Sequence, residues 1–335
     1  MKLQKYEHNP ILSPNRNNYW EELCTCNPGA WYENGKFYLL YRAAGKDHEH
    51  KIYLGLAESE DGFNFVRVSD EPVLSPSFDG PDSGCVEDPR IVKFDDYYFI
   101  TYAYRPYPPG QYWNFGPDEV LQYECPEAAP LVLKNNITNS GLLISKDLRT
   151  FKRVGRITRS SLDDRDVILF PEKVNGKFVM LHRPKEWVGE KYGCDYPSIW
   201  ISFSDDLMEW GNDILLAKGE QEWERKIGGS TPPLRTEEGW LTLYHGVDAK
   251  GIYRVGVMLL DLENPAKVIA RSPHYIMEPE YDYEFEGFYK GCVFPTGNVI
   301  VGDILYVYYG GADKYCCVAT CSVKKLLDYV LQFKK

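Results

Sequence analysis

One pattern of residues recurs five times along this chain of 335 residues. Each copy begins at a proline, continues through a short β-prone run and a turn that usually contains glycine, and ends in an alternating apolar strand. The copies begin at Pro28, Pro89, Pro171, Pro233 and Pro295, with spacings of about 61, 82, 62 and 62 residues. A steady period of this length indicates a repeat architecture with one insertion.

Each copy also has the turn chemistry of a β-hairpin. The turns contain Asn34-Gly35, Asp95-Asp96, Asn175-Gly176, Glu238-Gly239 and Gly302-Asp303. A second motif, Ser-x-Asp followed four residues later by an aromatic residue, occurs at Ser59, Ser145 and Ser204 after other apolar strands. Its Ser and Asp side chains can bond nearby backbone, so we interpret it as a structural turn.

Two hairpins per unit make a four-stranded sheet, and five such sheets in a ring make a β-propeller. We therefore expect an all-β fold in which residues 1–335 form a single five-bladed β-propeller domain, with the five prolines at equivalent places. A pair of β-sandwich domains does not explain a period near 62. Residues 322–335 have an apolar side typical of a short C-terminal helix, and residues 104–136, which include Tyr112 and Trp113, predict an ordered insertion loop over one face.

Composition restricts the partners of this chain. A net charge of −11 with no basic tail argues against nucleic acid, and no apolar stretch is long enough to cross a membrane. Met1 is not followed by an apolar run, so we expect a cytoplasmic protein. The nine scattered cysteines lack the spacing of a zinc site, and we expect reduced thiols and no metal.

Polar residues cluster at corresponding points of the repeats. In a propeller the innermost strands line the central channel, so their ends converge although they are far apart in sequence. A single Arg or Asp near a turn is more often a solvated or capping residue, but charges that recur in all five units predict a pocket. These residues are Asn27, Glu87, Asp88, Arg90, Arg165, Asp166, Glu172, Arg183, Lys226, His245 and Asp313.

Several of these segments resemble glycoside hydrolase family 130, the β-mannoside phosphorylases and β-mannosidases. The resemblance rests on Gly84-Cys-Val-Glu-Asp-Pro-Arg-Ile91, on residues 169–184 (LFPEKVNGKFVMLHRP), on residues 226–233 (KIGGSTPP), on residues 239–247 (GWLTLYHGV) and on residues 308–313 (YYGGAD). Together they extend over roughly residues 27 to 313. They are specific for the family and much less specific for the reaction within it.

The resemblance implies an inverting enzyme with a mannose subsite and a neighbouring phosphate site. By position it implies that the sugar is bound by Asn27, Arg42, Lys51, Arg90, Tyr104, Arg105 and Asp313. It implies that phosphate is bound by Arg165, Arg183 and Lys226, with His245 beside them. Guanidinium forks match phosphate oxygens bidentately, so these residue types suit an anion. Asp166 is the expected ion-pair partner of Arg165, and an ordinary ion-pair network is the alternative interpretation of the three cations.

The chain departs from the family at the general acid. Family phosphorylases have an aspartate in a segment such as T-Y-T-A-Y-D, whereas residues 101–106 read TYAYRP, with Arg105 where the acid would lie. The family's arginine in the mannose subsite is replaced by Lys51. Asp88 is the first candidate for the acid, although a structural role in a salt bridge to Arg90 would explain this carboxylate equally well. The other candidates are Glu87, Glu224, Glu172, Glu222, Asp118 and Glu119.

Two reactions and one binding role fit this sequence. Phosphorolysis to mannose 1-phosphate needs one acid and a bound phosphate, whereas inverting hydrolysis needs a second carboxylate to activate water. The three retained cations favour a β-mannoside phosphorylase; an inverting β-mannosidase is the alternative, and a non-catalytic sugar-binding propeller comes third. We expect a small saccharide and inorganic phosphate as partners, no cofactor, and leave a homo-oligomer open. Replacing Arg183 by Ala is expected to abolish phosphate-dependent turnover with little change in thermal stability.

Overall fold

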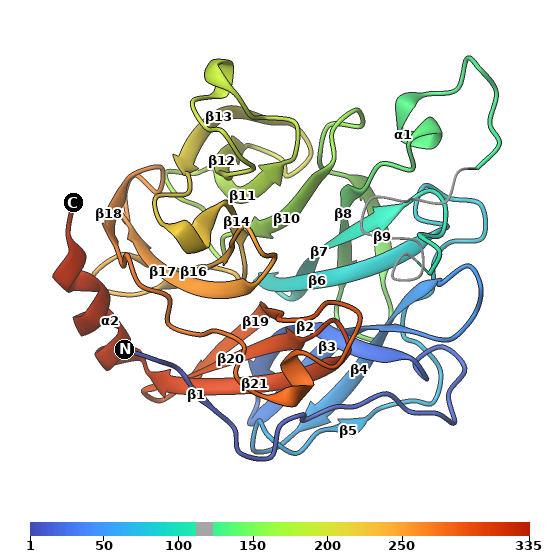
Figure 1. Cartoon of the computed structure of the whole chain (residues 1–335), viewed down its shortest axis with the longest axis horizontal. Helices are drawn as coiled ribbons and strands as arrows, with labels where there is room; N and C mark the ends of the chain where they lie inside the picture. Colours follow the sequence, from blue (N-terminus) through green and yellow to red (C-terminus); the bar gives the residue numbers. More distant parts are fainter. Residues whose placement is uncertain (112–122) are drawn as a thin grey trace.

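The structure is a computed structural model that describes residues 1–111 and 123–335. Within these residues nearly all regular structure is β, and the chain passes from one group of strands to the next around the molecule (Figure 1). The longest helix described is α2 (Val323–Val330), close to the C-terminus. No described helix has the length and apolarity that crossing a membrane would require.

The described strands fall into five antiparallel groups. The first contains β2 (Cys24–Glu33), β3 (Lys36–Ala44), β4 (Ile52–Ser59) and β5 (Val66–Arg67), and the second contains β6 (Cys85–Phe94), β7 (Tyr97–Arg105), β8 (Asn139–Ser145) and β9 (Lys152–Arg156). The third contains β10 (Asp164–Leu169), β11 (Phe178–Pro184), β12 (Ile199–Ser204) and β13 (Trp210–Ala217). The fourth contains β14 (Lys226–Gly229), β15 (Leu234–Arg235), β16 (Trp240–Val247), β17 (Tyr253–Leu260) and β18 (Val268–Arg271).

The fifth group joins the two ends of the chain. It contains β19 (Val293–Val301), β20 (Ile304–Gly311) and β21 (Tyr315–Ser322), and its last strand is β1 (Gln4–Lys5) from the N-terminus. β1 pairs antiparallel with β21 through Gln4 and Thr320. A separate parallel bridge between β4 and β6 joins the first two groups into one sheet.

Each group contacts the next through its inner strands. A Cβ atom on Gly29 would lie 2.6 Å from the Pro89 carbonyl oxygen, and Thr101 donates a hydrogen bond of 2.6 Å to the carbonyl of Val167. A Cβ atom on Gly229 would lie 2.7 Å from Ile168. Contacts of the fifth group complete the series: Asn298 donates to Thr231 at 2.7 Å, and Thr296 donates to the Pro28 carbonyl at 3.1 Å. The fifth group therefore lies between the fourth and the first.

The expectation that all five prolines occupy equivalent places is wrong. Pro28 and Pro89 do, since each lies in a β-bulge at the same point of its hairpin. In the third group the corresponding bulge contains Asp166 and Val167, whereas Pro171 follows the end of β10. Pro233 lies between β14 and β15, and Pro295 pairs with Tyr309 before the irregularity in its hairpin. What recurs is the bulge, which interrupts the ladder and redirects a side chain.

The bulges place polar residues in a left-handed backbone conformation. Asn27 has φ 47°, and Asp88 and Asp166 each have φ 54°. Asn and Asp tolerate this region better than other residues with a Cβ atom. The repeat therefore turns an Asn or Asp out of the inner strand at the same level in three consecutive groups.

The Ser-x-Asp motif is confirmed as a structural turn. Ser145 Oγ accepts from the backbone N–H of Leu148 at 2.8 Å, and Asp147 Oδ1 accepts from the backbone N–H groups of Arg149 and Thr150 at 2.8 Å each. The copies at Ser59 and Ser204 make the corresponding bonds.

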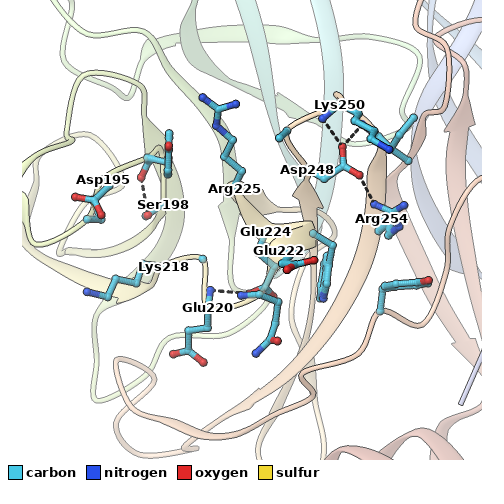
Figure 2. A pocket seen from close by; sticks show the side chains of 18 residues that line it. Asp195, Ser198, Lys218, Glu220, Glu222, Glu224, Arg225, Asp248, Lys250 and Arg254 are labelled. Atoms are coloured by element: carbon cyan, nitrogen blue, oxygen red, sulfur yellow. Dashed lines mark hydrogen bonds and ion pairs between the residues drawn. The ribbon is translucent and has the colours of Figure 1, made fainter.

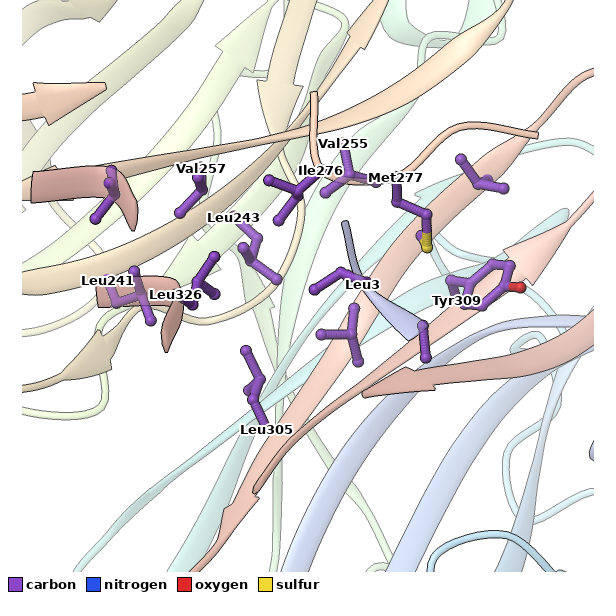
Figure 3. Packing of buried hydrophobic residues seen from close by; sticks show 14 of the residues in the cluster. Leu3, Leu241, Leu243, Val255, Val257, Ile276, Met277, Leu305, Tyr309 and Leu326 are labelled. Carbon is purple, nitrogen blue, oxygen red and sulfur yellow. The ribbon is translucent and has the colours of Figure 1, made fainter. Parts of the chain in front are cut away.

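The predicted C-terminal helix is confirmed as α2, which Ser322 caps by accepting from the N–H of Lys325 at 3.1 Å. Its buried face inserts Leu326 and Val330 into an apolar cluster with Leu3, Leu241 and Leu305 (Figure 3). Of the insertion, residues 104–111 and 123–136 are described, including the short helix α1 (Leu131–Lys134). Tyr112, Trp113, Asp118 and Glu119 lie outside the described residues.

Candidate active site

A cavity of about 730 Å³ opens at one end of the strand groups. At this end the first strand of each group begins and the second strand ends. The bulges of β2, β6 and β10 point into it, and β3, β11, β14 and β16 contribute residues from their adjoining ends. Most of the predicted site residues line this cavity: Asn27, Arg42, Glu87, Asp88, Arg90, Arg105, Arg165, Asp166, Arg183, Lys226, His245 and Asp313.

Four candidates from the sequence do not lie in this cavity. Lys51 points to the surface and pairs with Glu49 at 2.8 Å, and Tyr104 is buried in an apolar cluster of the first two groups. Glu172 is exposed beside Arg235. Glu222 lines a second cavity, of about 1060 Å³ (Figure 2). None of these four side chains is among the residues that line the cavity beside Asp88.

Glu224 is also separate from this cavity, and its contacts favour a structural role over the predicted catalytic one. It is buried, and one oxygen accepts from the Tyr244 hydroxyl at 2.6 Å and lies 2.9 Å from Arg271. The other oxygen accepts from the backbone N–H groups of Glu220 and Gln221 at 2.9 and 3.1 Å. With both oxygens engaged, Glu224 holds the start of β14 in place.

A carboxylate cluster occupies one side of the cavity. Asp88 accepts a hydrogen bond of 2.8 Å from Asn27 and lies 3.4 Å from Arg42, which also pairs with Glu87 at 3.1 Å. The predicted alternative, a salt bridge from Asp88 to Arg90, is not what the structure shows. Arg90 donates at 2.7 Å to the backbone carbonyl of Asp88, and its guanidinium lies 3.5 Å from the carboxylate of Asp166.

Asp313 completes this cluster from the turn after β20, where its φ is 54°. Burial raises the pKa of Asp313, and the neighbouring carboxylates Asp88 and Glu87 raise it further, although Arg42 and a hydrogen bond from Asn27 oppose the shift. A carboxyl group in such a setting keeps its proton more readily than an exposed one. Proton donors in enzymes are commonly prepared in this way.

A cluster of cations faces the cavity from the third and fourth groups. Arg183 Nε lies 2.6 Å from Asp166 Oδ2, and both side chains are buried. Arg165 pairs bidentately with Asp163, at 2.5 and 2.7 Å, and not with the expected Asp166. Burial alone would raise the pKa of Asp166, but Arg183, His245 and Arg90 hold it well below its usual range. Asp166 is therefore a buried carboxylate that organises the cations around it.

Lys226 and His245 complete the cationic side. Burial lowers the pKa of Lys226 to about 8, with Arg183 contributing to the shift, and its ammonium group donates to the Tyr253 hydroxyl at 3.3 Å. Burial also lowers the pKa of His245 to about 3, so its imidazole is neutral at pH 7. Burial lowers the pKa of Arg105 as well, with Arg165 contributing; Arg105 donates at 3.0 Å to the carbonyl of Asn136.

The lining of the cavity is strongly cationic. Nine of its described residues are Arg or Lys and four are Asp or Glu, in a chain whose net charge is −11. Such a local excess attracts an anion that the whole chain would repel. Sequence reasoning missed Lys185, Lys250, Lys290, Tyr253, Phe288 and Tyr289, which also line the cavity. All but Tyr253, the first residue of β17, lie in connections between strands, and the repeat gives no signal for which of these residues turn inward.

Comparison with known proteins places this geometry in a family. A family model described as beta-1,4-mannooligosaccharide phosphorylase matches residues 3–111 and 134–332. A 1,2-beta-oligomannan phosphorylase of Thermoanaerobacter sp. is 39% identical over 97% of this chain and 99% of its own length. A beta-1,2-mannobiose phosphorylase of the same organism is 37% identical over 97% and 99%.

A solved structure agrees with these relatives. The beta-1,2-mannobiose phosphorylase from Listeria innocua, in complex with beta-1,2-mannobiose, superposes with a TM-score of 0.78 at 26% sequence identity. The superposition covers 98% of this chain and 99% of that one. The superposition thus extends over all five strand groups.

Proposed function

The chain belongs to glycoside hydrolase family 130, and from this premise we propose that it cleaves β-1,2-linked manno-oligosaccharides by inverting phosphorolysis. The observation that carries the proposal is the division of the cavity into a carboxylate side, with Asp88 and Asp313, and a cationic side, with Arg165, Arg183 and Lys226. A phosphorylase needs both: an acid for the leaving oxygen and a site for the attacking phosphate. The β-1,2 linkage is proposed from the relatives named above.

The proposed reaction assigns a task to each side. Arg165, Arg183 and Lys226 hold inorganic phosphate, and one of its oxygens attacks C1 of the terminal mannose from the α face. The bond between C1 and the bridging oxygen breaks, and that oxygen takes a proton from a carboxyl group on the opposite side. The products are α-mannose 1-phosphate and a chain shorter by one mannose.

For the proton donor we propose Asp313, with Asp88 as the alternative. Asp88 accepts a hydrogen bond from Asn27 and pairs with Arg42, contacts that engage its charged form. Burial raises the pKa of Asp313, which favours its protonated form and suits it to the role of proton donor. Asn27, Arg42 and Arg90 then position the terminal mannose, and the buried, neutral His245 beside Asp166 orients the cationic side.

The alternative reaction, hydrolysis, fits the cavity less well. It needs a free carboxylate on the cationic side to activate water. Among the described residues there, Asp166 is paired with Arg183, and Asp163 is held bidentately by Arg165. A carboxylate engaged with two guanidinium nitrogens is a poor base. The same contacts leave the remaining guanidinium nitrogens of Arg165 and Arg183 for an anion.

We also propose that the five strand groups are the blades of one five-bladed propeller domain formed by residues 1–335. Contacts between successive inner strands support it, including those of Thr296 with Pro28 and of Asn298 with Thr231. Pairing of β1 with β21 supports it as well, because it completes the last sheet with the first strand of the chain. A ring of this kind brings the bulges of distant repeats to one cavity.

The test is product analysis with and without phosphate. We expect β-1,2-mannobiose to give α-mannose 1-phosphate only when phosphate is present, with β-1,4-mannobiose turned over much more slowly. Phosphorus NMR would identify the anomer. Free mannose formed at the same rate without phosphate would establish the hydrolase instead, and binding without any product would establish a sugar-binding protein. Lys226→Met serves as the matched variant, because it removes one cation of the proposed phosphate site.

A further inference from the structure

The side chain that lies opposite the β-bulge differs between the strand groups. It is Tyr41 in the first group, Tyr102 in the second and His182 in the third. The Tyr41 hydroxyl donates at 3.0 Å to the buried carboxylate of Glu21, and the Tyr102 hydroxyl donates at 3.1 Å to that of Asp82. Both carboxylates precede the inner strand of their group. In these two groups the hydrogen bond therefore holds the segment before the inner strand.

In the third group the carboxylate belongs to the inner strand itself. Asp164, the first residue of β10, has one oxygen 2.9 Å from Nδ1 of His182, and both side chains are buried. A carboxylate only accepts hydrogen bonds, so the ring donates from Nδ1. The other oxygen of Asp164 accepts from the backbone N–H of Arg183 at 3.1 Å. The group with histidine in place of tyrosine is therefore the one whose carboxylate also holds a residue of the cationic side.

Two carboxylates of β10 hold Arg183. Asp164 accepts from its backbone N–H, and Asp166 Oδ2 lies 2.6 Å from its Nε. Asp166 thus fixes the guanidinium directly, whereas Asp164 fixes the backbone from which the side chain starts. A guanidinium that binds an anion through two parallel hydrogen bonds depends on the direction of its fork as well as on its charge. A shift of the Arg183 backbone would therefore weaken the binding of an anion.

A chain of hydrogen bonds from the outer strands fixes the His182 ring. Its Nε2 lies 2.9 Å from Oγ of Ser202 on β12, and that hydroxyl donates at 2.6 Å to Asp213 on β13. Asp213 is paired in turn with Arg159 at 2.7 Å. Both ring nitrogens of His182 have a partner, so the ring has one preferred orientation, and the carboxylate of Asp164 that faces it is held with it.

We propose that His182 is a positioning residue for phosphorolysis: through Asp164 it sets the direction in which Arg183 presents its guanidinium to phosphate. The proposal rests on the proposed function, since it takes Arg183 as a phosphate ligand. Neither His182 nor Asp164 is among the residues that line the cavity, so both act through Arg183. Loss of the hydrogen bond to Asp164 weakens phosphate binding more than sugar binding, because Asn27 and Arg42 come from a different strand group.

Two variants separate the contributions of the two ring nitrogens. In His182→Asn the amide can donate to Asp164 from the place of Nδ1, whereas in His182→Gln it reaches the place of Nε2 and leaves Asp164 without this donor. We expect the KM for phosphate to rise about tenfold or more in His182→Gln, and the KM for β-1,2-mannobiose to change less than about twofold. In His182→Asn the KM for phosphate should stay within about threefold of the wild-type value. Equal phosphate KM values in the two variants, or an equal rise in both KM values, would overturn the proposal.

Tyr102→Phe is the matched control for lost stability. It removes the corresponding buried hydrogen bond, to Asp82, but the residue after Tyr102 is Ala103, which has no polar side chain to position. We expect this variant to have a lower melting temperature and an unchanged KM for phosphate. A phosphate KM raised as much as in His182→Gln would assign the effect to a loosened fold and refute the proposal. If His182→Gln does not fold, Asp164→Asn replaces it, and an unchanged phosphate KM in that variant would also refute the proposal.

Crystal structures of the variants separate this proposal from the proposed function. We expect the guanidinium of Arg183 to be displaced from Asp166 in His182→Gln and to keep its place in His182→Asn. If the activity of the wild type is indifferent to phosphate, the proposed function fails, and this comparison still tests the positioning of Arg183. An unmoved Arg183 in both variants would refute the positioning role and leave the proposed function standing.

Discussion

Lys226 is a cavity residue whose charge is expected to change with pH close to neutrality. Burial, with Arg183 and Arg165 beside it, lowers its pKa to about 8, so its ammonium group loses its proton as the pH rises through that value. A neutral amine attracts phosphate far less. We expect kcat/KM for phosphate in the free enzyme to fall above about pH 8. Lys226→Arg, which stays charged, should shift this fall to higher pH. An unchanged profile in that variant would assign the titration to another group.

Arg183 also has a structural role, which could not be predicted from its position in the sequence. The expectation that Arg183→Ala leaves stability unchanged does not fit the structure, because Arg183 is paired with the buried Asp166 at 2.6 Å. Removing one partner of a buried ion pair typically costs roughly 3–5 kcal/mol. We expect Arg183→Ala to abolish phosphate dependence and to lower the unfolding free energy by an amount of that order. Chemical denaturation measures the second effect, and Lys226→Met, which breaks no ion pair, should not show it.

Asp313 tests which carboxyl group supplies the proton. We expect Asp313→Asn to lower kcat/KM for mannobiose at least tenfold and to spare a substrate with a good leaving group, such as 4-nitrophenyl β-mannoside. A group whose folded-state pKa is raised contributes stability at low pH that is lost as the pH rises through that pKa. The Asn variant should therefore be at least as thermostable as the wild type at pH 7. Equal losses on both substrates would return Asp313 to sugar binding alone and favour Asp88.

At the level of single residues, the sequence indicated which side chains gather but not how they pair. The recurring charges predicted the cavity because every repeat presents the same end of its inner strand. The partner of Arg165 could not be read from adjacency. The bulge turns Asp166 toward Arg183 on β11, and Arg165 pairs instead with Asp163, which directly precedes β10. Glu224 lies two residues before Lys226 in sequence, yet its carboxylate faces away from the cavity, toward Tyr244.

At the level of structural elements, local hydrogen bonds and backbone conformation determine the turns and the bulges. The Ser-x-Asp turns were predictable because their hydrogen bonds form within six residues. A fourth copy without the serine occurs at Asp261, which accepts from the backbone N–H groups of Glu263 and Asn264 at 3.0 and 2.9 Å. The bulges were not predictable from the prolines, because only two of the five lie in one. Their signal is an Asn or Asp that can adopt positive φ, a much weaker pattern.

The turn at Asp147 gives a test at this level. Burial would raise the pKa of Asp147, but the backbone N–H groups of Thr150 and Arg149 hold it below its usual range. Its contribution to stability is therefore present above the unfolded pKa and lost as the pH falls. We expect Asp147→Ala to lower the unfolding free energy at pH 7 by about 1–2 kcal/mol without changing kcat/KM. Asp205→Ala, at an exposed site, is the control and should change stability by less than about 0.5 kcal/mol.

Across the whole molecule, the two ends of the chain meet in one apolar cluster. Leu3 follows the N-terminus and Leu326 lies in α2, and both are buried with Leu241 and Val255 of the fourth group and Leu305 of the fifth (Figure 3). Lys5, on β1, forms a buried ion pair of 2.8 Å with Glu284. The repeat period predicted the number of strand groups, but nothing in it indicated that the last sheet takes its fourth strand from the first residues of the chain. That pairing is non-local, because it joins Gln4 to Thr320 at the other end of the chain.

The packing of the two chain ends against each other predicts that distant substitutions destabilise the same unfolding transition. Replacing a buried leucine by alanine typically costs about 2–5 kcal/mol, because it loses apolar contacts and leaves a cavity. If residues 1–335 form one cooperative domain, Leu3→Ala and Leu326→Ala should each lower the midpoint of a single calorimetric transition, with activity and intrinsic fluorescence lost at the same temperature. Val66→Ala, at a side chain 73% exposed, should leave the midpoint nearly unchanged. Two separate transitions, with only one shifted by each leucine variant, would show that the ends of the chain stabilise independent units.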